Sequence, residues 1–219
     1  MASSKPSRSG EDDESQDRPA GDPEGTPEGA GEPRPVRVIA GLGNPGARYD
    51  GTRHNVGFRV VEELARRRGW SLAEGECNAR LAEGPELILV QPLTYMNRSG
   101  HTLRCLTERR AAALADVLVV YDEVHLPLGR LRLRPKGSPA GHRGLESVIE
   151  SLRTDEVPRL RLGVEGSDPP APEDLAEYVL APFEGEELSV VDEMIERAAD
   201  ACETWLESGI ETAMNRHNG

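Results

Sequence analysis

The sequence predicts an α/β fold: a single domain with a mixed, twisted β-sheet flanked by helices, preceded by a disordered acidic N-terminal tail. Short apolar runs rich in β-branched residues are interspersed with longer segments whose apolar residues recur at helical spacing, which is the pattern of an α/β protein. Some predicted strands follow one another too closely for a crossover helix, so the sheet must contain both parallel and antiparallel neighbours.

Residues 1–35 differ in composition from the rest of the chain. They are mostly Ser, Gly, Pro, Asp and Glu, with nine acidic against four basic side chains. Such a segment buries too little apolar surface to offset its chain entropy, so we predict a disordered tail over 1–35 and a folded domain over 36–219. We interpret the tail as a passive solubilising segment, with a regulatory or partner-binding role as the alternative.

Five strands are predicted within the folded domain. Nearly continuous apolar runs, typical of strands covered on both faces, occur at Val36–Leu42, Leu87–Gln91 and Val117–Tyr121. Alternating runs, typical of half-exposed strands, occur at Arg130–Arg134 and Arg159–Val164.

Three helices are predicted from the helical spacing of apolar residues. They cover Val56–Arg68, Gly141–Leu152 and about Glu184–Glu207. The last of these carries one long apolar stripe, and we assign it to packing, with a role as a lid as the alternative.

Charge and cysteine content limit the possible functions. The net charge of −13 excludes a surface uniformly attractive to nucleic acid, so an RNA ligand would need a local basic patch. Cys77, Cys105 and Cys202 are odd in number and far apart, which predicts reduced thiols with neither a disulfide framework nor a zinc site. No apolar run approaches the roughly 18–20 residues of a membrane span. We therefore expect a cytoplasmic protein without a membrane partner.

The segment Gly41–Gly46, GLGNPG, follows the first predicted strand and has the spacing of a dinucleotide-binding turn. In that motif a helix starts at once, so that its amides meet the pyrophosphate, whereas the helical pattern here starts only near Val56. A nucleotide site is therefore disfavoured, and no cofactor is predicted. The turn instead places Asn44 at the carboxyl edge of the sheet, where α/β proteins locate their sites.

Polar clusters stand at the ends of three apolar strands. They are Gly43–Gly46 together with Thr52–Asn55, then Thr94–Gly100, and finally Tyr121–Glu123. Each cluster alone has an ordinary explanation, such as a helix cap or a loop acid. Together they supply a base, an acid to orient it and amide groups, with no metal-ligand spacing nearby. This set predicts metal-independent hydrolysis.

Five segments of the folded domain stand out together: GLGNPGARYDGTRHNVG, PLTYMNRSG, YDEVHLPLGRLRL, GHRGLESVIESL and RLRLGVEG. They resemble the signature blocks of bacterial-type peptidyl-tRNA hydrolases, in the same order and at similar spacing. The resemblance extends from about Arg37 to Arg216. It implies cleavage of the ester bond between a peptide and the 3′ end of its tRNA, with contacts to the acceptor stem and 3′ CCA end. Such cleavage recycles tRNA from prematurely released peptidyl-tRNA.

The resemblance also implies residue roles. His54 matches the catalytic histidine that draws a proton from the attacking water, and an imidazole suits that task because its pKa lies near working pH. Asp122 matches the acid that orients this histidine. Asn44 and Asn97 match amides that hold the substrate, and such a donor on the developing oxyanion is worth roughly 3 kcal/mol. Tyr49 matches a tyrosine near the 3′ end of the tRNA, where its ring could stack.

Two further residues of these blocks bear on substrate binding. Tyr95 stands in the second block beside Asn97 and is expected at the substrate. Arg143 departs from the family, which most often has an asparagine there to help bind the 3′ end. Arginine keeps donors but loses the amide acceptor and adds a charge suited to phosphate.

The run Arg130–Arg134 places arginines at every second residue, on one face of a strand. Lys136 and Arg159 lie near it in sequence or in a neighbouring strand. The resemblance implies that Arg134 and Arg161 grip the 5′ phosphate of the tRNA, which would make binding salt-dependent. A solvated strand face is the alternative for the run taken alone.

A different functional class competes with the enzyme: a non-catalytic RNA-binding protein on the same fold. The presence of His54, Asp122, Asn44 and Asn97 argues against it. A hydrolase of other esters is disfavoured only by the basic stripe, the arginines of the run Arg130–Arg134. We expect a monomer.

Overall fold

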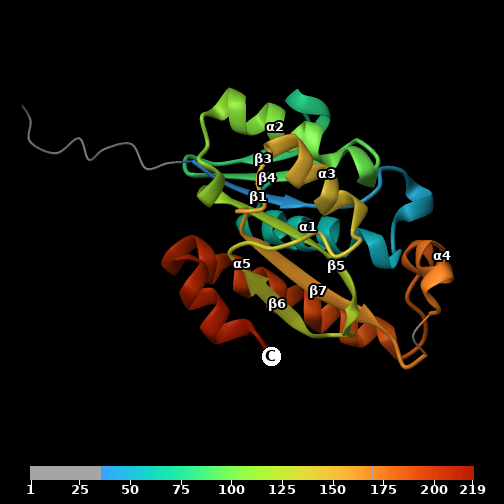
Figure 1. The fold of residues 1–219 in the computed structure, drawn as a ribbon. Coiled ribbons are helices and arrows are strands. Elements are labelled where there is room, and N and C mark those ends of the chain that lie inside the picture. The colour runs from blue at the N-terminus through green and yellow to red at the C-terminus, as the bar shows by residue number, and fades with distance from the viewer. Residues whose placement is uncertain (1–35, 169) are drawn as a thin grey trace, which may run out of the picture. The chain divides into compact units, whose positions relative to one another are not determined.

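The computed structural model describes residues 36–168 and 170–219, and these residues form a mixed seven-stranded sheet with helices on both faces (Figure 1). The strand order is β2-β3-β4-β1-β5-β7-β6. The strands are β1 (Arg37–Gly41), β2 (Ala73–Glu74), β3 (Ala79–Glu83), β4 (Leu87–Pro92), β5 (Val117–Pro127), β6 (Leu131–Arg134) and β7 (Arg159–Glu165).

The four central strands are parallel and the outer strands are antiparallel. β1 pairs in parallel with β4 and with β5, and β5 pairs in parallel with β7. β3 runs antiparallel to β4, β2 to β3, and β6 to β7. The mixed sheet predicted from the short connections is therefore confirmed.

The helices form two layers (Figure 1). α1 (Val56–Arg68) and α5 (Glu187–His217) cover one face, while α2 (Ser99–Arg110) and α3 (Arg143–Leu152) cover the other. The short helix α4 (Leu175–Leu180) lies at the side of the molecule where the arrow of β1 ends. Six 3₁₀ turns connect the described elements, at Ala47–Tyr49, Arg53–Asn55, Glu76–Asn78, Met96–Arg98, Leu114–Asp116 and Pro172–Asp174.

Strands β1, β4 and β5 each contribute to two hydrophobic cores. Ile39 and Leu118 belong to the core under α1 and α5, whereas Val38 and Val119 belong to the core under α2 and α3. Because successive side chains of a strand point to opposite faces, a strand covered on both sides must be apolar throughout. This requirement explains the continuous apolar runs in the sequence.

The structure contains every predicted strand and helix, and elements that the sequence did not indicate. Helix α2 was missed because its buried face includes Ser99, Gly100 and Thr102 besides leucines, which blurs the apolar spacing. Strand β2 was missed because it has only two residues, and β3 because its sequence, ARLAE, contains no β-branched or aromatic residue. The last helix continues to His217, ten residues beyond its predicted end, and changes direction at Gly209, where φ is 77°.

Close packing of two glycines sets where α1 begins. A Cβ atom at Gly41 would lie 2.0 Å from the carbonyl oxygen of Gly57, and one at Gly57 would lie 2.4 Å from the carbonyl oxygen of Val120. Only glycine fits at both places. The start of α1 can therefore lie directly on β1 and β5, which brings the preceding turn, with His54, to the side chains of β5.

The prediction of three reduced cysteines is wrong for two of them. Cys77 and Cys105 form a disulfide with their Cα atoms 5.6 Å apart, and Cys202 is free and buried in the core. The spacing of the cysteines gave no signal, because the pairing depends on α2, which the sequence did not predict. The disulfide fastens α2 to the turn Glu76–Asn78 that precedes β3.

The C-terminal end of the chain protects an edge of the sheet. Strand β6 is the last strand on its side, and the Asn218 side chain bonds to its backbone at Leu133. The carboxamide oxygen accepts from the Leu133 amide at 2.6 Å, and the carboxamide nitrogen donates to the Leu133 carbonyl at 3.3 Å.

No helix in the described ranges is long and apolar enough to cross a membrane. The predicted disordered tail over 1–35 lies outside the described residues, so that prediction and the domain boundary at residue 36 stay predictions.

Replacing Cys77 and Cys105 together by serine is expected to lower the free energy of unfolding by about 3 kcal/mol, because the bridge closes a loop with a sequence separation of 28. Chemical denaturation measures this difference. Dithiothreitol should bring the wild type to the level of the double variant and leave the variant unchanged. Equal stability of both proteins without reductant would contradict the bridge.

Candidate active site

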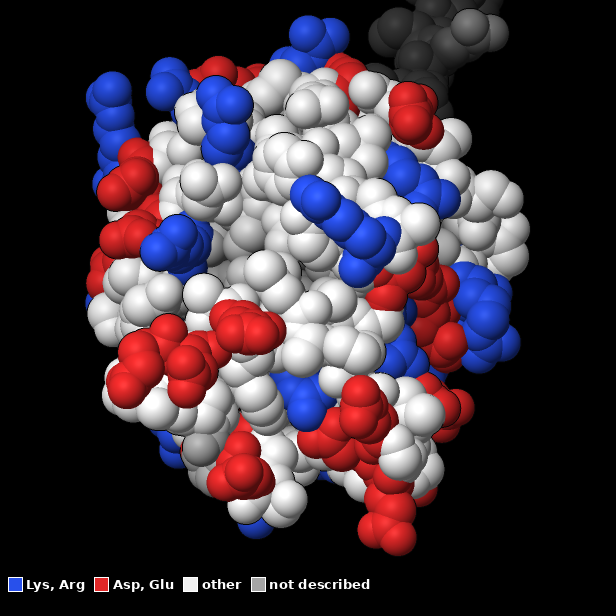
Figure 2. Space-filling model, turned by 90° about the vertical axis from the view of Figure 1, so that its right-hand side faces the viewer, with Lys and Arg blue, Asp and Glu red and all other residues white. Residues whose placement is uncertain are grey.

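A cleft of about 560 Å³ opens where β1 and β4 end and along the second half of β5. This edge of the sheet faces the viewer in Figure 2, where a hollow lies near the centre and the largest acidic clusters lie in the lower half. The lining residues come from the predicted polar clusters, from the start of α3 and from α4. They are Asn44, His54, Tyr95, Met96, Asn97, Asp122, Glu123, Val124, His125, Ala140, Gly141, His142, Arg143, Pro172, Glu173, Leu175, Ala176, Val179 and Leu180.

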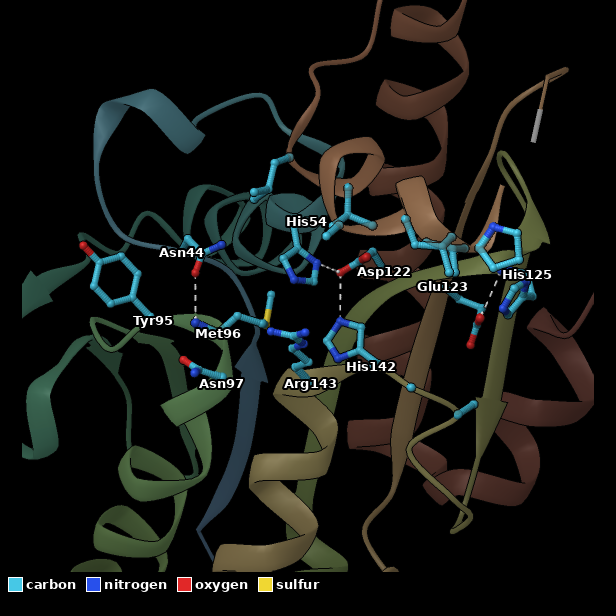
Figure 3. Close-up of a pocket in the computed structure, with 18 of the residues that line it drawn as sticks. Asn44, His54, Tyr95, Met96, Asn97, Asp122, Glu123, His125, His142 and Arg143 are labelled. Atoms are coloured by element: carbon cyan, nitrogen blue, oxygen red, sulfur yellow. Dashed lines mark hydrogen bonds and ion pairs between the residues drawn. The ribbon is translucent and has the colours of Figure 1, made fainter. Parts of the chain in front are cut away.

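The predicted base and the predicted acid meet in this cleft (Figure 3). Nδ1 of His54 lies 2.8 Å from Oδ1 of Asp122. The Asp122 side chain is 1 % exposed and the His54 side chain 13 %. Because the ionised carboxylate can only accept, Nδ1 of His54 carries the proton, and its Nε2 keeps a lone pair. This arrangement is that of an oriented general base.

A second histidine, which the sequence analysis missed, shares the same acid. Nε2 of His142 lies 3.0 Å from Oδ1 of Asp122, and Nδ1 of His142 accepts from the Leu145 amide at 3.1 Å. The amide can only donate, so His142 is a neutral ring with its proton on Nε2. The sequence analysis placed His142 inside the helix predicted over Gly141–Leu152, whereas in the structure it is the N-cap of α3.

Burial and charge oppose each other in this group. Burial alone would lower the pKa of His54, but the negative charge of Asp122 and its hydrogen bond outweigh burial and raise that pKa above 6.5. Burial would likewise raise the pKa of Asp122, but the two histidines hold it well below its usual range. Asp122 is therefore ionised while His54 exchanges its proton.

Asn44 is held so that the nitrogen of its side-chain carboxamide, Nδ2, is left for a ligand. Its backbone amide donates to the Asn55 side chain at 2.9 Å, and the Asn55 side chain donates to its carbonyl at 3.0 Å. Its side-chain oxygen accepts from the Met96 amide at 2.9 Å. Because Met96 can only donate there, the oxygen of Asn44 must face it, and Nδ2 remains as a donor beside the cleft.

Three predicted substrate-binding residues also line the cleft. Tyr95 and Asn97 follow β4 and are exposed, and Arg143 stands at the first position of α3 (Figure 3). Tyr95 is 53 % exposed, which leaves its ring free to contact a ligand.

Tyr49, Arg134 and Arg161 lie outside the cleft lining. Tyr49 ends a 3₁₀ turn and lies under the guanidinium of Arg48, at 4.6 Å from it. The guanidinium of Arg161 is paired with the buried carboxylate of Glu123. Arg134 makes no ion pair with any residue in the described ranges, so its charge is available.

The basic stripe is confirmed in part. In β6, Leu131 and Leu133 are buried while Arg132 is exposed, as the alternation predicted. Arg159 does not belong to a free basic surface, however: it is 2 % exposed and donates to three backbone carbonyls. Its place in an alternating strand could not reveal that its guanidinium holds the preceding loop together.

The side chains of His54, Asp122 and His142 are also the one group of three in the described part of the chain whose ligand atoms could hold a metal ion, since they lie within 4.8 Å of one another. The sequence spacing did not indicate this. Each histidine already donates to Oδ1 of Asp122, so a cation would have to displace both protons. The observed hydrogen bonds are those of an acid–base group.

Comparison with known proteins agrees with the site. The family model described as peptidyl-tRNA hydrolase matches residues 38–219. The chain belongs to the peptidyl-tRNA hydrolase family. The resemblance of the five sequence blocks is thereby confirmed.

Members of this family are similar over nearly their full length. The peptidyl-tRNA hydrolase of Methylacidiphilum infernorum is 48 % identical over 180 residues, which cover 82 % of this chain and 96 % of the relative. That of Bacillus cytotoxicus is 43 % identical over 187 residues, covering 84 % and 100 %. The crystal structure of the Acinetobacter baumannii enzyme is 30 % identical, with a TM-score of 0.78, covering 84 % and 96 %.

Replacing Asp122 by asparagine is expected to move the titration midpoint of His54 from above 6.5 to below 6.5, because burial then acts without the opposing negative charge. NMR titration of the His54 ring measures the midpoint directly. Asp116→Asn is the matched control, since Asp116 lies beside Arg37 at 3.7 Å, in contact with another part of the chain. A midpoint that stays above 6.5 in Asp122→Asn would contradict this account.

Proposed function

We propose that this protein hydrolyses the ester bond between a peptide, or an N-blocked amino acid, and the 3′ end of tRNA, with His54 as the base that activates water. The contact of 2.8 Å between His54 and the buried Asp122, on the wall of a cleft, carries the proposal. Membership of the peptidyl-tRNA hydrolase family supports the substrate. Released tRNA can then be charged again, so the reaction recycles tRNA from prematurely released peptidyl-tRNA.

In the proposed mechanism, water attacks the ester carbonyl as Nε2 of His54 takes one of its protons. The ionised Asp122 stabilises the imidazolium that forms. Nδ2 of Asn44 donates to the oxyanion of the tetrahedral intermediate. The intermediate then expels the ribose oxygen, which takes the proton back from His54. The products are a peptide carboxylic acid and a tRNA with a free terminal hydroxyl.

The 3′ end of the tRNA is assigned to the rim of the cleft that bears Tyr95, Asn97 and Arg143. The exposed ring of Tyr95 can stack on a base, and the Arg143 guanidinium can pair with a phosphate. Arg143 stands where the family most often has asparagine, so it binds this end by charge where an amide would bind by donor and acceptor.

The acceptor stem and its 5′ phosphate are assigned to Arg134 and Arg161, with Tyr49 nearer the 3′ end. Arg134 has no competing ion pair among the described residues, whereas Arg161 is neutralised by Glu123. A phosphate at Arg161 would therefore have to share the guanidinium with that carboxylate. We expect Arg134 to contribute more to binding than Arg161.

We further propose that the protein is a cytoplasmic monomer. The cytoplasmic assignment rests on the substrate, which arises during translation. The Cys77–Cys105 disulfide removes the support that reduced cysteines would have given, since such bridges are rare in cytosolic proteins.

Replacing His54 by alanine is expected to lower kcat at least about 100-fold, because a general base contributes that much or more. The assay is release of N-acetyl-amino acid from N-acetyl-aminoacyl-tRNA, with EDTA present. His101→Ala is the control, since His101 is an exposed histidine on α2. Tight tRNA binding by a wild type that releases nothing would identify a non-catalytic RNA-binding protein instead.

Replacing Arg134 by alanine is expected to weaken tRNA binding and to reduce the slope of log Kd against log salt by about one, because one phosphate contact is lost. Fluorescence anisotropy over a salt series gives both values. The control is Arg104→Ala, whose guanidinium is paired with Glu108 on the surface of α2. An unchanged slope would remove Arg134 from the tRNA-binding surface.

A further inference from the structure

Arg53, the residue directly before His54, is a buried cation with no part in the chemistry described above. Its side chain is 8 % exposed. An arginine is rarely buried unless it is paired, because removing its charge from water is costly. Its partners therefore indicate what it holds in place.

The partners of the Arg53 side chain and of its backbone amide come from one segment, residues 178–187. Its backbone amide donates to the Ala181 carbonyl at 3.1 Å, and Nη1 donates to the Pro182 carbonyl at 3.1 Å. Nη2 lies 2.8 Å from both carboxylate oxygens of Glu187. The guanidinium also lies 4.6 Å from the ring centroids of Tyr178 and Phe183. We call this set of contacts the Arg53 clamp.

The clamped segment contains the end of α4, and α4 is a wall of the cleft. Leu175, Val179 and Leu180 all line it. The Tyr178 hydroxyl ties the same helix to the end of β7, since it donates to the Val164 carbonyl at 2.7 Å and accepts from the Gly166 amide at 2.9 Å. Among described residues, α4 is thus held from one side by Arg53 and from the other by β7.

The other side of Arg53 is the reacting centre. The 3₁₀ turn Arg53–Asn55 carries the base His54 in its middle, and its last residue, Asn55, holds the backbone of Asn44. Three consecutive residues therefore fix the wall, the base and the oxyanion donor. A shift of α4 relative to the base would have to break the Arg53 clamp.

The chemistry of the α4 wall suits the peptide rather than the tRNA. Residues 165–196 contain no Lys or Arg and are rich in Asp and Glu. Such a wall repels phosphate, while its leucine and valine side chains offer apolar contacts. The acidic lower half of the face in Figure 2 agrees with this assignment.

We propose that Arg53 is a positioning residue that holds α4 as the peptide-binding wall of the cleft at a fixed distance from His54. This inference rests on the proposed function. Orientation of a bound ester against a base is a large part of catalysis, so a loosened wall weakens productive binding of the peptide. Lysine cannot replace arginine here, because its ammonium group is not planar. It cannot stack near the rings of Tyr178 and Phe183 while it donates to both the Pro182 carbonyl and the Glu187 carboxylate.

The test compares Arg53→Lys and Glu187→Gln, which open the clamp from its two sides. We expect each variant to raise KM for N-acetyl-dipeptidyl-tRNA about tenfold. The KM of the double variant should be no higher than that of the more impaired single variant, because both substitutions remove the same interaction. The midpoint of the acid limb of kcat against pH should stay at the wild-type value. Arg59→Gln is the matched control, since Arg59 joins α1 to Asp192 of α5 at 2.6 Å without touching α4.

Hydrogen exchange measures the wall without any substrate. The backbone amides of Leu175–Leu180 should exchange about tenfold faster in both clamp variants, with no change in α2, because local opening becomes easier when its anchoring contacts are lost.

The outcomes separate the possibilities. Unchanged KM in active clamp variants, or a lower Tm as the sole effect, would overturn the inference and leave the proposed function standing. A shifted acid limb would also overturn it, because Arg53 would then act through the base. If the wild type releases no N-acetyl-dipeptide, the proposed function fails and this inference with it, whatever the exchange rates.

Discussion

The buried carboxylate of Asp122 is the group on which the site depends. A single oxygen, Oδ1, accepts hydrogen bonds from two histidines, and these bonds determine the tautomer of each ring. An ionised carboxylate is stable at 1 % exposure only with such partners. The same charge raises the pKa of His54, so one residue sets the orientation, the tautomer and the basicity of the proposed base.

The topology of the sheet assembles the rest of the site around that carboxylate. Parallel pairing of β1 with β4 and β5 brings three chain segments to one edge, and the close approach of Gly41 and Gly57 lets the His54 turn reach β5. Residues that precede α2 and residues at the start of α3 complete the lining of the cleft. The site is therefore a product of strand order, although its members are distant in the sequence.

The sequence alone predicted five of the described strands, three of the helices, and the pair His54 and Asp122, because each of these leaves a local pattern. It could not predict that His142 shares Asp122, since that contact joins residues on β5 and α3 through the fold. The prediction that Cys77 and Cys105 are reduced was wrong, and the burial of Arg159 was missed, for the same reason. Both depend on tertiary neighbours, which neither cysteine spacing nor strand alternation records.

The pairing of Asn218 with β6 also bears on how the sheet meets other chains. An edge strand with free backbone groups invites another chain to add to the sheet. Asn218 presents one donor and one acceptor to Leu133, as a neighbouring strand would, and so occupies part of that edge with a single side chain. The backbone of β6 is therefore occupied at Leu133, while the side chain of Arg132 on the same strand stays exposed to solvent.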